Sequence, residues 1–365
     1  MPRYLRHLFL LAALLPAAFA GPAIDVVQVA DLSGPNSNTA RDFVTGARTY
    51  FDQINAAGGV NGRPINLVVA DDGGDPASTV VLSRKLVSQY RPVALFGLFG
   101  DDNVLKVLAD KQLAGVPLVA PYIGSEQTLG PAVYSLRASS VDEIAKISRI
   151  AAQSGIRQMG VVVGDDALSR SIAGQIGKLL KDNHVALTGF VRLPAQGGDI
   201  DAAAAQLAGK APQAVILASP TINAAAFVQA YQRLRGSTPF YALSWVNPQT
   251  MQEFLGNEAI RWVAVSALVP SPYNPTLPIA REFVSALKKY RDEPPSYASM
   301  EGYLAARMLV DALRGGDASS VALRRNLDSY RRNLGGFALK MDGTNSRASR
   351  FVDLAVFSGS GRLVN

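Results

Sequence analysis

The chain of 365 residues contains no cysteine and only two histidines, His7 near its start and His184. The absence of cysteine excludes disulfide bonds, thiolate nucleophiles, thiolate metal sites and lipid attachment through an N-terminal cysteine. A single histidine in the body of the chain supports neither a Ser-His-Asp triad nor a histidine-rich metal site. We therefore expect no catalytic residue, metal ion or cofactor, although a hydrolase that works with carboxylates stays open as a distant alternative.

Long apolar stretches are also missing, apart from one near the N-terminus. A basic start is followed by an apolar segment at residues 8–15 and by Ala18-Phe19-Ala20, a small-x-small pattern. This order is typical of a secretory signal peptide, and the apolar segment is too short to span a bilayer. We expect residues 1–20 to be removed by cleavage after Ala20 and the mature protein to be exported.

Charge of either sign is not concentrated in the sequence. Lysine and arginine number 36 and the acidic residues 29, which gives a net charge of +7. The short basic clusters, such as Lys288-Lys289 and Arg324-Arg325, have no aromatic residues between them. We interpret them as solvated helix faces and expect no nucleic-acid partner.

Short apolar segments typical of strands alternate with helical patterns along most of the chain. The strand-like segments cover residues 24–30, 65–70, 93–96, 116–120, 133–136, 159–163, 185–192, 214–218, 240–244 and 262–268. Such alternation predicts an α/β fold with largely parallel, doubly wound sheets. Because it occurs in two series, we expect two similar lobes.

The alternation ends at a proline-rich segment, residues 270–278, which predicts a crossover. Helices are expected at 279–290 and 297–313. Apolar segments at 336–341 and 351–357 then flank Asp342-Gly343. This arrangement predicts a β-hairpin between the two segments.

The most informative stretch is residues 93–125, which predicts a strand, a glycine turn, a helix ending near Gly115, a second strand and a second turn. A parallel βαβ unit places both turns at the carboxyl edge of the sheet, where ligands bind in open α/β folds. We therefore predict a small-molecule cleft here. Asp101 and Asp102 open the helix, and they either cap it or face the ligand.

Several motifs carry a family resemblance. They include Leu32-Ser33-Gly34-Pro35, Asp71-Asp72-Gly73, Gly115-Val116-Pro117 and the runs at 54–63 and 300–306. In these motifs and their order, the chain resembles the periplasmic solute-binding proteins of ABC importers, of the leucine/isoleucine/valine-binding type.

The resemblance implies two Rossmann-like lobes joined by three crossovers, with a cleft that closes by hinge motion. It implies an N-terminal lobe of residues 21–137 and 268–334, and a C-terminal lobe of residues 138–267 and 335–365. It further implies a monomer that performs no chemistry. Such a protein captures an amino acid or a related small polar or organic-acid solute and delivers it to an inner-membrane ABC permease. A sensor that partners a membrane receptor or kinase would use the same cleft.

The resemblance also implies ten positions that contact the ligand. They are Gly100, Asp101, Asp102, Asn103, Ile123, Gly124, Ser125, Leu168, Ser219 and Trp245. In the family, the two N-lobe turns hold a ligand carboxylate through backbone N–H and Ser/Thr hydroxyl groups. Here the first turn offers acids, and Ile123 stands where threonine is frequent, so the pocket departs from that of branched-chain amino acid binders. We hypothesise that Asp101 and Asp102 favour a ligand with a cationic or strongly hydrogen-donating group.

Overall fold

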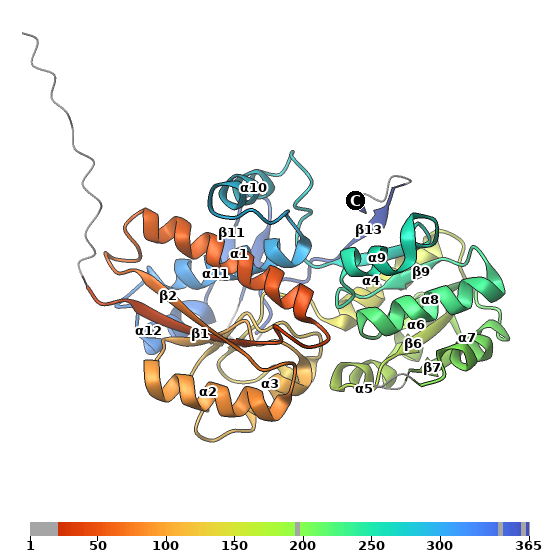
Figure 1. The fold of residues 1–365 in the computed structure, drawn as a ribbon, viewed down its shortest axis with the longest axis horizontal. Helices are drawn as coiled ribbons and strands as arrows, with labels where there is room; N and C mark the ends of the chain where they lie inside the picture. Colours follow the sequence, from red (N-terminus) through yellow and green to blue (C-terminus); the bar gives the residue numbers. More distant parts are fainter. Residues whose placement is uncertain (1–20, 194–197, 342–345, 359–362, 365) are drawn as a thin grey trace, which may run out of the picture.

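The computed structural model describes residues 21–193, 198–341, 346–358 and 363–364, and places them in two α/β lobes (Figure 1). The first lobe contains a five-stranded, fully parallel sheet in the order β2-β1-β3-β4-β5. Its strands are β1 (Ile24–Ala30), β2 (Ile65–Asp71), β3 (Ala94–Phe96), β4 (Leu118–Val119) and β5 (Val133–Tyr134).

The second lobe contains a seven-stranded sheet in the order β14-β13-β10-β9-β8-β6-β7. Its strands are β6 (Gln158–Val163), β7 (Ala186–Arg192), β8 (Ala214–Ala218), β9 (Phe240–Ala242), β10 (Val263–Ala267), β13 (Asp353–Phe357) and β14 (Leu363–Val364). Strands β6 to β10 are parallel, whereas β13 runs antiparallel to β10, and β14 to β13. The chain thus passes between the sheets after β5, after β10 and before β13. The predicted α/β class with two Rossmann-like lobes is confirmed.

Helices connect the strands and cover the sheets (Figure 1). Those joined to the first sheet are α1 (Ser37–Ala56), α2 (Pro76–Tyr90), α3 (Asp101–Leu108), the short 3-10 helix η1 (Glu126–Thr128), α10 (Pro278–Tyr290), α11 (Tyr297–Leu313) and α12 (Ser320–Asp328). Those around the second are α4 (Ser140–Gln153), α5 (Ala167–Ala173), α6 (Ile176–Asp182), α7 (Ile200–Ala208), α8 (Thr221–Arg235) and α9 (Pro248–Ile260). No helix among the described residues has the length and apolar character needed to cross a membrane.

Three local predictions need correction. Helix α3 ends at Leu108, well before Gly115. The helical pattern at 167–180, between the strand-like segments 159–163 and 185–192, predicts one helix, but the structure has two, α5 and α6. The predicted C-terminal hairpin is wrong, because β12 (Ala338–Lys340) pairs with β11 (Arg331–Asn333) and β13 pairs with β10. Asp342-Gly343 lies outside the described residues.

The core of the first lobe includes residues from the C-terminal third of the chain. Helix α11 is buried along nearly its whole length, against α1 and the first sheet. Met341 and Ala348, which follow β12, belong to the same cluster of buried side chains. Of the described residues, Met341 and Ala348 thus still pack with the first lobe, and the second sheet is reached at β13.

Helices α1 and α11 approach each other closely enough for their backbones to touch. A Cβ atom placed on Gly46 would lie 1.8 Å from the carbonyl oxygen of Ser299, and one on Gly302 would lie 2.0 Å from that of Phe43. Only glycine permits this contact, because any side chain would push the helices apart. These two positions hold the N-terminal and C-terminal parts of the first lobe together.

We expect Gly302→Ala to lower the free energy of unfolding by about 1–3 kcal/mol or more, because the methyl group meets rigid backbone. The control is Gly177→Ala in α6, where a Cβ atom meets nothing within 4 Å. That variant should be neutral or more stable by up to about 1 kcal/mol. Urea denaturation measures both, and equal stability of the two variants would contradict the close packing.

Candidate functional site

A cavity of about 600 Å³ lies between the lobes, at the carboxyl ends of strands from both sheets. Of the predicted ligand positions, seven line it: Gly100, Asp101, Asp102, Asn103, Leu168, Ser219 and Trp245. Ile123 is fully buried in the first lobe, behind the wall. Gly124 lies directly against Leu168 and Trp245, since a Cβ atom there would be 2.9 Å from an atom of each. The two lobes thus bring seven of the ten predicted positions to one cavity, whereas Ile123, Gly124 and Ser125 are not among its lining residues.

Some lining residues were not predicted. They are mainly Asp31, Pro35, Asn36, Phe99, Lys106 and Asp166. The motif Leu32-Ser33-Gly34-Pro35, which directly follows β1, was the available signal for the first three, because that loop also ends at the carboxyl edge of the sheet.

Asp101 does not cap α3. Gly100 is the N-cap residue, and it makes no side-chain cap. The carboxylate of Asp101 instead accepts hydrogen bonds from the backbone N–H groups of Gly124, at 3.1 Å, and Ser125, at 2.9 Å. Asp101 is only 4% exposed. The capping interpretation is therefore wrong for this residue, which holds the second turn in place.

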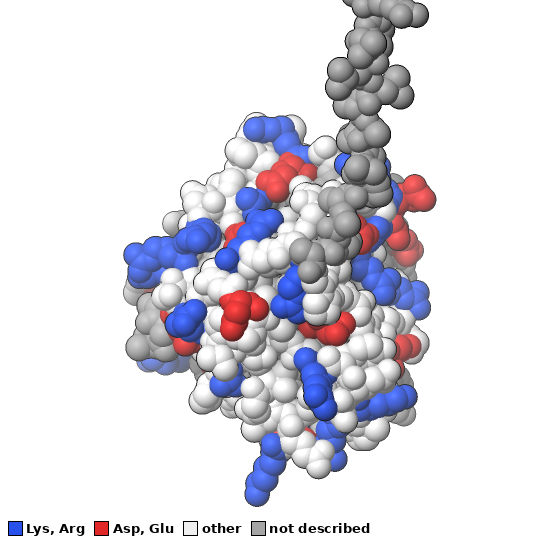
Figure 2. Space-filling view, turned by 90° about the vertical axis from the view of Figure 1, so that its left-hand side faces the viewer, with Lys and Arg blue, Asp and Glu red and all other residues white. Residues whose placement is uncertain are grey.

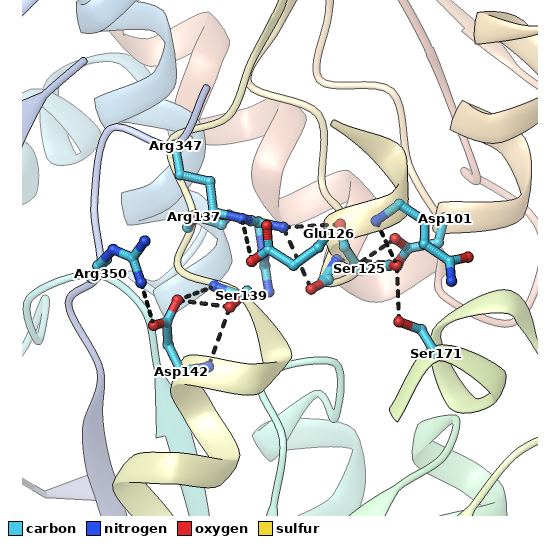
Figure 3. Close-up of polar contacts among 11 residues, drawn as sticks. Asp101, Ser125, Glu126, Arg137, Ser139, Asp142, Ser171, Arg347 and Arg350 are labelled. Atoms are coloured by element: carbon cyan, nitrogen blue, oxygen red, sulfur yellow. Dashed lines mark hydrogen bonds and ion pairs between the residues drawn. The ribbon is translucent and has the colours of Figure 1, made fainter. Parts of the chain in front are cut away.

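Arg347 holds the same turn from its carbonyl side. Its guanidinium donates to the carbonyl oxygens of Ser125, at 2.9 Å, and Arg137, at 3.1 Å, and pairs with Glu126 at 3.2 Å (Figure 3). Burial lowers the pKa of Arg347, while the negative charges of Glu126, Asp142 and Asp101 oppose that effect. The turn after β4 is thus fixed by a carboxylate on its N–H groups and a guanidinium on its carbonyl groups.

Asp102 points across the interface. Its carboxylate accepts from the backbone N–H of Ala167 at 3.0 Å and pairs with Arg170 at 3.1 Å, both on α5 of the second lobe. It is no helix cap either. A cationic ligand group at this position would have to compete with Arg170.

Other polar contacts also join the lobes. The hydroxyl groups of Ser125 and Ser171 are 3.2 Å apart (Figure 3), and the Asn38 amide donates to the Thr250 hydroxyl at 2.9 Å. The lobes therefore meet on both sides of the cleft, as in a closed form.

Two polar atoms in the cavity wall have no hydrogen-bond partner among the described residues. They are the Trp245 indole Nε1 and the Ser219 hydroxyl, and both atoms are buried. Buried indole N–H groups usually find an acceptor. Both residues follow strands of the second sheet, so the two donors come from the second lobe.

A buried arginine, which was not predicted, lies at the first crossover behind Trp245. Arg137 pairs with Glu301 of α11 at 3.0 Å and donates to the Ser244 hydroxyl at 2.7 Å. Its guanidinium lies 3.5 Å from the centre of the Tyr122 ring and 5.6 Å from that of Trp245. Burial alone would lower the pKa of Arg137, but the charge of Glu301 raises it above the ordinary value.

Two buried carboxylates accompany this cation. Glu143 accepts from the Ser244 backbone N–H at 2.7 Å and from the Ser266 hydroxyl. Burial raises the pKa of Glu143 and also of Glu301, while Arg137 opposes the effect in each. The network joins α11 of the first lobe to the loop after β9 of the second.

A second cavity, of about 680 Å³, lies on the other side of Tyr122. Its lining includes Thr39 and Asp42 of α1, Tyr297 of α11 and Asn247 before α9. Burial raises the pKa of Asp42, which the Ser296 hydroxyl partly offsets. Tyr122, which packs edge-on against Trp245 at 5.4 Å between ring centres, separates the two cavities.

The described residues contain no group of three His, Asp or Glu side chains that could hold a metal ion. On the face of the molecule in Figure 2, Lys and Arg side chains are scattered among Asp and Glu and do not merge into one basic surface. Among the described residues, the 600 Å³ cavity is the one that combines seven of the predicted positions with loops at the carboxyl ends of strands from both sheets, and its groups are suited to binding.

Comparisons with known proteins agree with this architecture. A family model described as periplasmic binding protein matches residues 23–361. Leu/Ile/Val-binding protein homolog 7 of Brucella suis is 24% identical over 94% of this chain and 92% of its own. A substrate-binding periplasmic protein from Ralstonia solanacearum is 30% identical, with a TM-score of 0.85 over 93% of this chain and 99% of its own. An extracellular ligand-binding receptor from Verminephrobacter eiseniae is 25% identical, with a TM-score of 0.88 over 94% and 100%.

Arg137→Met removes the buried cation and leaves two carboxylates uncompensated. We expect the free energy of unfolding at neutral pH to fall by about 3–5 kcal/mol, and the double variant Arg137→Met/Glu301→Gln to recover part of that loss. The control is Arg261→Met, which breaks an exposed pair with Glu258 and should change stability by at most about 1 kcal/mol. Urea denaturation compares them. A double variant no more stable than the single one would show that uncompensated charge is not the cause.

Proposed function

The chain belongs to the family of periplasmic binding proteins, and we propose that it captures a small organic solute between its lobes and delivers it to an inner-membrane ABC permease. The family is one of solute-binding proteins, so the chain has a binding role. The name of the Brucella relative favours an amino acid or a related polar or organic-acid solute. Periplasmic delivery as a monomer is part of the same proposal.

The observation that carries the proposal is the interlobe cavity. Each lobe contributes loops at the carboxyl ends of its strands, and polar groups of the two lobes meet around the cavity. A solute bound there would touch both walls at once, and binding would therefore favour the closed arrangement.

We propose that closure occurs about the three crossovers. The N-terminal lobe would comprise residues 21–137 and 268–334 and the C-terminal lobe residues 138–267, with 335–365 divided between them. Because Ala348 packs in the first core and β13 joins the second sheet, we place the last crossover between Ala348 and Asp353.

Tryptophan fluorescence offers a direct test, because the chain has only Trp245, in the cavity wall, and Trp262. Trp262→Phe leaves Trp245 as the reporter and should show a saturable spectral change when a solute binds. The matched variant Trp245→Phe leaves Trp262, which does not line the cavity, and should show little change. Equal responses in both variants would place the binding event elsewhere.

We expect binding of the solute in the same titration to make the protein more compact. At a solute concentration a hundredfold above Kd, stability should rise by about 2.7 kcal/mol. Small-angle scattering should then show a smaller radius of gyration than without solute. An unchanged radius at saturation would argue against hinge closure.

Export is the remaining element of the proposal, and residues 1–20 lie outside the described part of the structure. We expect the intact mass of protein from the periplasmic fraction to correspond to a chain that begins at Gly21, because Ala18-Phe19-Ala20 provides the cleavage pattern. A Phe19→Ala variant should keep the site, whereas Ala20→Arg should block cleavage. A full-length mass in the exported pool would contradict the assignment.

A further inference from the structure

We propose that the cleft takes a solute without a carboxylate, namely an uncharged carbonyl compound with an apolar body. This inference rests on the proposed binding function; of the solutes named there, it keeps the uncharged polar ones and excludes amino acids and organic acids. Three features of the described residues carry it. The carboxylate of Asp101 occupies the N–H groups of the turn after β4, acids outnumber cations around the cavity, and two donors in its wall have no partner.

The first feature is the internal carboxylate of Asp101. Two successive backbone N–H groups at the end of a strand form a ready anion site. Here those of Gly124 and Ser125 already donate to Asp101, at 3.1 and 2.9 Å. Arg347 fixes the same turn through its carbonyl groups (Figure 3), so the turn cannot simply rotate toward a solute. A solute carboxylate would find these donors occupied.

The second feature is the charge around the cavity. Besides Asp101, the lining includes Asp31, Asp102 and Asp166, and its cation is Lys106. Asp31 accepts from the N–H groups of Gly34 and Asn36, which fixes its orientation. In a cleft closed to water, a carboxylate brought beside these acids is repelled more strongly than in bulk solvent.

The third feature is the pair of free donors. The Ser219 hydroxyl and the Trp245 indole N–H line the cavity and have no partner among the described residues. Ser219 is 4% exposed, so a partner for its hydroxyl has to be enclosed with it when the lobes come together. A carbonyl oxygen accepts two hydrogen bonds and suits both donors. Leu168 of the second lobe and Phe99 of the first also line the cavity and offer apolar contact to the rest of the solute.

The test uses matched probes that differ only in charge. Phenylacetamide is compared with phenylacetate, isovaleramide with isovalerate, and leucinamide with leucine, by calorimetry on the mature protein. We expect each amide to bind roughly tenfold to hundredfold more tightly than its acid, the range for losing or gaining a charged contact. Leucinamide, which carries an ammonium group, also tests whether a cationic group improves binding.

Matched variants separate the internal carboxylate from general charge. Asp101→Asn removes the charge from the turn and frees a backbone donor, so the preference for amide over acid should fall about tenfold. Asp166→Asn removes the same charge from the cavity but leaves the turn intact, and keeps its capping ability. It should change the preference much less. Ser219→Ala should weaken amide binding about fivefold and leave the preference nearly unchanged.

The wild-type protein alone can overturn the inference, so it does not depend on the variants folding. If an acid binds as tightly as its amide, the solute class is wrong while the proposed binding function stands. If no amide binds, the inference fails as well, and the proposed function is then judged by the fluorescence and scattering response to other solutes. If Asp101→Asn and Asp166→Asn changed the preference for amide over acid equally, the turn after β4 would not be what excludes a carboxylate.

Discussion

The buried ion pair between Arg137 and Glu301 is the constraint on which the relation between the lobes depends. Both side chains are almost fully buried, so their desolvation is costly unless every polar atom finds a partner. The two terminal nitrogens of Arg137 find partners in both lobes, Glu301 in the first and Ser244 in the loop after β9 of the second, whereas its Nε has no partner among the described residues. Large displacement of that loop would strip a partner from a buried charge.

Trp245 connects this junction to the cavity. Its indole lines the cavity wall on one side and faces Arg137 and Tyr122 on the other. A solute that shifts the indole would therefore also change its contacts with Arg137 and Tyr122 at the crossover. The Asp101 and Arg347 contacts work in a similar way on the opposite wall, because they fix the turn that carries Gly124 against Trp245. Recognition and hinge geometry share the same few side chains.

The sequence was sufficient to predict features that depend on local patterns. Strand and helix periodicity predicted the α/β lobes, and the rule that parallel strands end at one edge predicted a cleft at residues 93–125, where Gly100 lines the cavity. Leu168 and Trp245, which also line it, were positions that the family resemblance implied. The prediction of a hairpin was wrong because β12 pairs with β11 and β13 pairs with β10. The local sequence pattern does not indicate which strands will pair.

The prediction that Asp101 caps α3 was wrong for a similar reason, namely a partner that is distant in the sequence. An acid at the start of a helix caps it in most contexts, yet here the competing acceptor role is set by a turn after the next strand. Arg347 and Arg137 were not predicted, because their hydrogen-bond partners are distant in the sequence. Polar networks of this kind depend on three-dimensional proximity, which periodicity does not encode.

The balance between open and closed forms follows from the strength of the contacts that close the cleft. Asp102–Arg170 is a half-exposed pair, which contributes at most about 1 kcal/mol, and the Ser125–Ser171 and Asn38–Thr250 hydrogen bonds contribute about 0.5–1.5 kcal/mol each. These terms are comparable with the entropy lost when exposed side chains are fixed. These three contacts alone therefore do not lock the cleft shut, which agrees with the hinge closure proposed above. A solute that contacts both walls can then shift the population from the open to the closed form. Its apparent affinity is reduced by the free energy required for closure.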